Sequence, residues 1–267
     1  MEHLIQIGRA FFAVALLGLG IGHFAFQDFI TGRAPAWPES VPGGHVWAML
    51  TGAVLVTVSF ALLAGKKARP AAILAAGLVF GWALLRQIPV TVASPFLSAE
   101  WTDAGKALRF VGGALSVAAT LPRERGTGTA GFWRFINSRA EFILVGRVFV
   151  GVTLIINGIQ HFTSTKFVAS LIPAWFPGDA LAWTYFGGVA LTAGGLGLLI
   201  PQTSRWAALL SGAMILSWFF IVHVSREIAG VADGIAVFEA LATAGMLFVI
   251  AGYLFEHNGH IVRSGSG

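Results

Sequence analysis

Three ionisable residues in the second half of the chain lie in long apolar runs: His161, His223 and Glu239. A charged side chain at the centre of a membrane helix costs about 2.5–3.5 kcal/mol on insertion scales, so such a residue usually has a partner or a task. A histidine beside a carboxylate can take up and release protons. We therefore predict that the three converge on one cavity as its catalytic groups. Replacing Glu239 by glutamine should then abolish ligand binding or turnover and leave folding nearly intact.

The first half carries a polar set of more cationic character, which we predict to line a second pocket. Two internal alignments support this: Gln87 aligns with His223, and Arg109 aligns with Glu239 when Asp103 is matched to Asp233. Two tryptophans follow Pro-Ala in outer loops, and Trp175 is expected to cover the cavity of the second half. The candidate cofactor-binding residues are therefore His23, Arg86, Gln87, Arg109, Trp37 and Trp175.

Each of these residues also has a simpler structural interpretation. His23 and His161 could each hydrogen-bond a backbone carbonyl near a helix end. The two arginines could form structural ion pairs, and the two tryptophans could belong to an aromatic belt at the membrane interface. The acidic partners available to the arginines are Asp28, Glu100 and Asp103.

The composition indicates that these residues are positioned by membrane helices. The chain has 267 residues, of which 56% are hydrophobic and only 11% charged, whereas about a quarter of the residues in a soluble domain are charged. The net charge of +5 does not indicate a nucleic-acid partner, because the basic residues sit in short gaps between apolar runs. The chain has no cysteine, which excludes disulfides, thiolate metal sites and iron–sulfur clusters. We predict no metal site.

Eight stretches are long and apolar enough for a membrane span, which needs about 20 such residues. Backbone groups find no water in the bilayer, so these spans must be helices. We also expect the first run to stay as a span, because it lacks the basic lead of a cleavable signal. The predicted spans are Ile5–Phe29, Trp47–Ala64, Pro70–Val92, Ala104–Leu121, Phe142–Phe162, Leu181–Ile200, Arg205–Ile228 and Val231–Leu254.

The distribution of lysine and arginine predicts the orientation, because such residues are enriched on the cytoplasmic side. With the N-terminus inside, ten of them fall on the cytoplasmic side and four on the outer side. Both termini and the basic segment between the halves are therefore expected in the cytoplasm. All the candidate pockets then lie in the outer half of the bilayer.

The two halves of the chain are copies of one unit. Shifting the numbers by 138 makes thirteen of the thirty residues at 8–37 identical to those at 146–175. Further on, a shift of 136 matches Trp82 to Trp218. Since four spans per unit is an even number, both copies should point the same way, related by an axis along the membrane normal.

We therefore predict an all-α integral membrane protein with eight transmembrane helices, arranged as two parallel-repeat four-helix bundles. The expected parts are a first unit at 1–121, a basic cytoplasmic linker at 122–141, a second unit at 142–255 and a C-terminal tail at 256–267.

Each unit opens with a Gly-Arg pair, which is followed by an apolar run ending in Gly-x-x-His-Phe and then by a Pro-Ala-Trp loop. This pattern resembles the DoxX family of small bacterial membrane proteins. The motifs are Gly8-Arg9, Gly20–Phe24 and Pro35–Trp37, with their counterparts in the second half. Many members have a single unit, so two fused units are a departure. The resemblance implies a membrane subunit of quinone-linked oxidation or of redox-stress complexes, in a bacterial inner membrane.

Three functions remain open at this point. The first is a quinone- or quinol-binding redox subunit, which would need a redox partner protein because the chain has no redox centre of its own. The second is a non-catalytic carrier or transporter of a lipid-soluble ligand, and the third is an assembly factor for another membrane protein. Besides membrane lipid, quinone is the expected cofactor. Haem is not favoured, because each unit offers one equivalent histidine, His23 or His161, without a second that recurs.

Overall fold

Every regular element of the described residues is a helix. The structure is a computed structural model that describes residues 1–30, 34–122, 138–231 and 234–264, with side chains described as far as 257. The elements of the first half are α1 (Glu2–Phe26), α2 (Gly44–Ala64), α3 (Ala68–Trp82), the π-helix η1 (Ala83–Gln87), α4 (Ile88–Ala93) and α5 (Ala99–Ala119). Those of the second half are α7 (Arg139–Thr163), α8 (Thr165–Ser170), α9 (Ala180–Leu199), α10 (Ser204–Trp218), the π-helix η2 (Phe219–Val224), α11 (Ser225–Ile228) and α12 (Ile235–Ser264).

Seven helices of the described residues are long and apolar enough to cross a membrane, which supports an all-α, multi-pass membrane protein. One of the seven candidate spans is continuous through α3, η1 and α4, and another is continuous through α10, η2 and α11. The predicted span at 104–121 is not among the seven. It lies in α5, whose first half carries Glu100, Asp103, Lys106 and Arg109.

The burial pattern also favours a lipid environment. Large apolar side chains such as Phe60, Leu85 and Leu210 are more than half exposed on the outer faces of the helices. In α12, 78% of the apolar stretch is buried, against 22–44% in the other six candidate spans. The protein therefore surrounds α12 with other helices and presents its remaining apolar faces outward.

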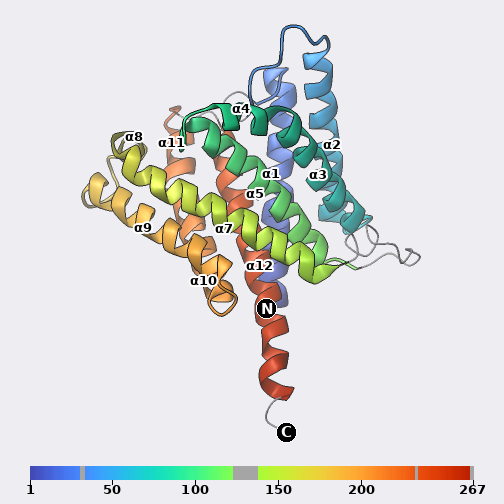
Figure 1. Cartoon of the computed structure of the whole chain (residues 1–267), viewed down its shortest axis with the longest axis vertical. Coiled ribbons are helices and arrows are strands. Elements are labelled where there is room, and N and C mark those ends of the chain that lie inside the picture. Colours follow the sequence, from blue (N-terminus) through green and yellow to red (C-terminus); the bar gives the residue numbers. More distant parts are fainter. Residues whose placement is uncertain (31–33, 123–137, 232–233, 265–267) are drawn as a thin grey trace.

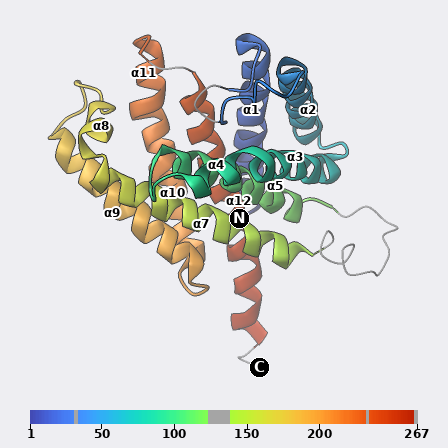
Figure 2. The same cartoon turned by 45° about the horizontal axis from the view of Figure 1, so that its top comes forward.

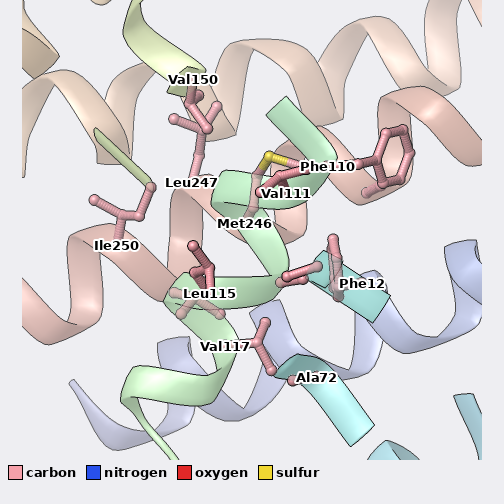
Figure 3. Packing of buried hydrophobic residues seen from close by; sticks show 14 of the residues in the cluster. Phe12, Ala72, Phe110, Val111, Leu115, Val117, Val150, Met246, Leu247 and Ile250 are labelled. Carbon is pink, nitrogen blue, oxygen red and sulfur yellow. The ribbon is translucent and has the colours of Figure 1, made fainter. Parts of the chain in front are cut away.

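The two halves lie side by side and share a core. Figure 1 shows α1, α2 and α3 on one side and α9 and α10 on the other, and Figure 2 shows α5 and α12 between them. The halves meet where α1 packs against α12, α5 against α7, and α5 against α12. Figure 3 shows Phe12, Phe110, Val150 and Met246 among the residues of this shared core.

The same irregularity interrupts one helix in each half. A π-helical turn follows directly after Trp82 in the first half and after Trp218 in the second. These are the two tryptophans that the internal alignment matches. Short π-helical segments within α-helices often occur at functional sites, and each of these two carries residues of a predicted pocket.

Two predicted boundaries differ from the structure. Of the expected linker at 122–141, residues 123–137 lie outside the described residues, and α7 already begins at Arg139. The expected tail from 256 is instead helical as far as Ser264, because α12 continues without a break. Asp233, which is matched to Asp103 when the two halves are aligned, also lies outside the described residues. So does Arg33, one of the four basic residues predicted on the outer side.

Paired glycines let the two halves approach closely. A Cβ atom on Gly8 of α1 would stand 2.5 Å from the carbonyl oxygen of Gly245 on α12. At the other junction, a Cβ on Gly146 of α7 would stand 2.9 Å from the carbonyl oxygen of Gly112 on α5. A side chain at these positions would press on backbone, which cannot move aside without separating the helices.

We expect Gly8→Ala to lower the free energy of unfolding in detergent by about 1–3 kcal/mol, the usual cost of overpacking. Gly77→Ala is the matched control, because no atom lies within 4 Å of a Cβ at that position. It should be neutral or slightly stabilising, since alanine favours helix over glycine. Equal stability of the two variants would contradict the close packing of α1 on α12.

Candidate functional site

A cavity with a volume of about 250 Å³ lies in the second half, and its mostly apolar wall carries several polar side chains. We call it the second-half cavity. His161 from α7, His223 from η2 and Glu239 from α12 all line it, together with Asn157 and Arg109. Much of the remaining wall is apolar and includes Leu154, Leu171, Ile172, Leu191, Ile215 and Val222. The structure thus brings the three predicted residues together on one cavity, while their catalytic role stays a prediction.

The orientation of His161 is fixed by its own helix. Its Nδ1 lies 2.7 Å from the carbonyl oxygen of Asn157, one turn earlier. A carbonyl only accepts hydrogen bonds, so Nδ1 carries the proton and Nε2 of the neutral ring is an acceptor. Nε2 receives no hydrogen bond from the described residues, and a Cβ on Gly187 of α9 would stand 3.3 Å from it. The hydrogen bond from His161 to a backbone carbonyl, which was its simpler structural interpretation, is therefore present. It leaves Nε2 available to a ligand.

A cluster of charges forms the wall between the halves. Nζ of Lys106 lies 3.3 Å from Oδ1 of Asp103 and 3.6 Å from Oε2 of Glu239. Arg109 is buried and interacts electrostatically with Glu239. Its Nε is buried without a hydrogen-bond partner. Glu239 of the other half therefore provides a negative charge near Arg109.

Arg109 lies at a different cavity from the one predicted for it. The repeat assigned it to the first pocket, but its side chain lines the second-half cavity. The reason is that α5 packs against both α7 and α12, so it contributes to both halves.

A smaller cavity of about 130 Å³, which we call the first-half cavity, lies in the first half. His23, Arg86 and Gln87 line it as predicted, with Trp82 and Thr51. His23 repeats the geometry of its counterpart, with Nδ1 2.8 Å from the carbonyl oxygen of Leu19. The two equivalent histidines line separate cavities, so they do not meet as a pair of ligands to one group.

Lys106 and Glu239 line both cavities. The ion pair between them therefore stands in a wall that the two cavities share. A ligand that engages either charge in one cavity changes the electrostatic field in the other.

Neither of the predicted binding tryptophans, Trp37 and Trp175, lines a cavity. Trp175 is 63% exposed and donates its indole N–H to Oγ of Ser225 at 2.8 Å. Trp37 stacks on Phe29 with ring centres 5.6 Å apart, and the Cζ of Arg86 lies 5.1 Å from its ring centre. The prediction that Trp175 covers the second-half cavity is wrong, because its loop turns the indole toward α11.

Sequence reasoning missed several residues that do line the cavities. Trp82 lines the first, Trp183 and Trp218 line the second, and Asn157 adds a buried amide oxygen without a hydrogen-bond partner. The match of Trp82 to Trp218 was a usable signal, as was an asparagine one turn before His161. Lys106, one of the four basic residues predicted on the outer side, was not expected to line a cavity. The described residues contain no cluster of His, Cys, Asp and Glu that could hold a metal ion.

A family model described as a domain of unknown function (DUF8561) matches residues 150–249. Neither the curated proteins nor the solved structures gave a significant match. The matched stretch runs from α7 into α12 and includes His161, His223 and Glu239. Its description names no activity, so the function has to be argued from the site, and the resemblance to the DoxX family stays a prediction.

Proposed function

We propose that this chain is a quinone- or quinol-binding membrane protein, with the ring of the ligand held in the second-half cavity. The observation that carries the proposal is the convergence of His161, His223 and Glu239 on one largely apolar cavity. A quinone head is a flat apolar ring with an oxygen at each end. It is best held by apolar walls with a few polar groups that fix its orientation.

The hydrogen-bonding roles of the site fit the two oxygens differently. Neutral His161 offers an acceptor at Nε2, which suits the hydroxyl of a quinol. Arg109 and Lys106 offer only donors, which suit a carbonyl or a deprotonated oxygen. His223 and Glu239 provide further groups that exchange protons. This division of acceptors and donors supports a ligand that changes between hydroxyl and carbonyl forms.

The electrons of such a change would pass to or from a redox partner protein. The chain has no cysteine and hence no thiolate to hold an iron–sulfur cluster. The role we propose for its own residues is to bind and orient the ring and to move its protons. A carrier that binds the same ligand without turnover remains the second candidate, supported by the same cavity.

The proposed membrane arrangement has eight crossings, with α5 as the eighth and both termini in the cytoplasm of a bacterial inner membrane. The charged half of α5 is tolerated in this arrangement because the helix packs against α3, α7 and α12. Figure 1 supports an even number of crossings, since the N-terminus and the C-terminal part of α12 lie toward the same end. The two units would be related by rotation about the membrane normal.

We expect the protein purified in a mild detergent to carry an extractable quinone. Solvent extraction and chromatography should give close to one equivalent per chain. The control is a preparation of an unrelated multi-pass membrane protein from the same membranes. A quinone content no higher than in that control would contradict the proposal.

A further inference from the structure

Arg86 of η1 is a buried cation that the proposed quinone site does not use. It is 8% exposed and lines the first-half cavity. Its Nη2 donates to the carbonyl oxygen of Pro35. Its Nε and Nη1 are buried and have no hydrogen-bond partner. Buried donors of this kind are rare, and on a charged group they are costly.

Aromatic rings cover the guanidinium without satisfying these donors. Its Cζ lies 4.3 Å from the ring centre of Phe29, 5.1 Å from that of Trp37 and 6.0 Å from that of Trp82. Such contacts stabilise a cation by attraction to the ring face. The N–H groups lie in the guanidinium plane, however, and still need acceptors.

No carboxylate of the described residues forms an ion pair with Arg86. Asp28 is close enough to interact electrostatically, but its Oδ1 accepts the backbone N–H of Phe29 at 2.6 Å. Glu239 lines the same cavity, yet it is paired with Lys106. Arg86 therefore makes no direct ion pair with a described carboxylate, although the charge of Asp28 lies near enough to stabilise it.

The equivalent position of the second half carries no cation. With the shift of 136, Arg86 corresponds to Val222, which lines the second-half cavity. The two cavities thus differ in chemistry at corresponding places. His23 offers no donor to an anion in this cavity, since Nε2 of its neutral ring is itself an acceptor.

We propose that the first-half cavity binds a small organic carboxylate, with Arg86 as its main donor. A carboxylate is acceptor-only and offers two oxygens to the unpartnered nitrogens. The cavity volume of about 130 Å³, roughly half that of its counterpart, restricts the ligand to a short chain. The proposal does not rest on the proposed quinone site, although the two cavities share the wall that holds Lys106 and Glu239.

The test measures thermal protection of the full chain in nanodiscs by acetate, propionate and butyrate. Sodium chloride at equal ionic strength and acetamide, the neutral analogue of acetate, serve as comparison ligands. We expect saturable protection by one or more carboxylates that exceeds the protection by both comparison ligands. Arg86→Met should weaken that binding at least tenfold. Protection equal to that by chloride or acetamide would overturn the proposal.

Because Arg86→Met could disturb the aromatic cluster around it, a second variant keeps Arg86 and fills the cavity. Ala107→Leu adds bulk to a buried residue of the cavity wall. It should also lose carboxylate protection, while Gly187→Leu in the other cavity should retain it. Wild-type protection in Ala107→Leu would overturn the site. Since Gly187→Leu blocks only the quinone site, failure of one proposal is distinguishable from failure of the other.

Discussion

Replacing Glu239 by glutamine is expected to lower the free energy of unfolding by about 3–5 kcal/mol, the cost of breaking a buried ion pair. The carboxylate pairs with Lys106 at 3.6 Å and interacts with buried Arg109. Lys106 keeps Asp103 as a partner, but Arg109 loses its negative neighbour. Denaturant unfolding in detergent, followed by circular dichroism, measures the change.

A double-mutant cycle separates this charge coupling from other effects of the substitution. Arg109→Met alone should also destabilise, and the double variant with Glu239→Gln should be less destabilised than the sum of the two. Glu256→Gln is the matched control on α12, because that carboxylate is exposed. Strictly additive single effects would contradict the coupling of the two halves through Glu239.

Replacing Gly187 by leucine is expected to weaken quinone binding at least tenfold, which corresponds to about 1.4 kcal/mol. Gly187 lines the second-half cavity, and a Cβ there would stand 3.2 Å from Cδ2 of His161. The added side chain would occupy the space of the quinone ring and press on the ring of His161, without removing any polar group of the site. Gly77→Leu on α3 serves as the control, since open space surrounds that glycine. Equal affinity of the two variants for quinone would mean that quinone binds outside the second-half cavity.

The sequence predicted the convergence of His161, His223 and Glu239 because ionisable residues are rare in apolar helices and their depth can be counted along each span. It did not predict their partners. The internal alignment matches Arg109 to Glu239, yet the two residues interact, because α5 and α12 pack against each other at the junction of the halves. A repeat alignment shows which positions correspond but not which of them meet across the junction.

The sequence therefore also underestimated the structural importance of Glu239. It suggested that Glu239→Gln would leave folding nearly intact, because the ion pair with Lys106 was not visible in the spacing. The tryptophans show a similar limit. Trp37 and Trp175 share a loop motif, but in the structure Trp37 lies against Phe29 whereas Trp175 is exposed. The direction of a loop side chain depends on contacts that a motif does not contain.

The most direct test of the central claim is a fluorescence titration of the wild-type chain in nanodiscs with a short-chain quinone. Trp183 and Trp218 line the second-half cavity, so a bound quinone ring should quench their emission. The account predicts saturable quenching at one quinone per chain, lost in Gly187→Leu and retained in Gly77→Leu. Quenching that rises linearly with quinone, and equally in all three proteins, would contradict it.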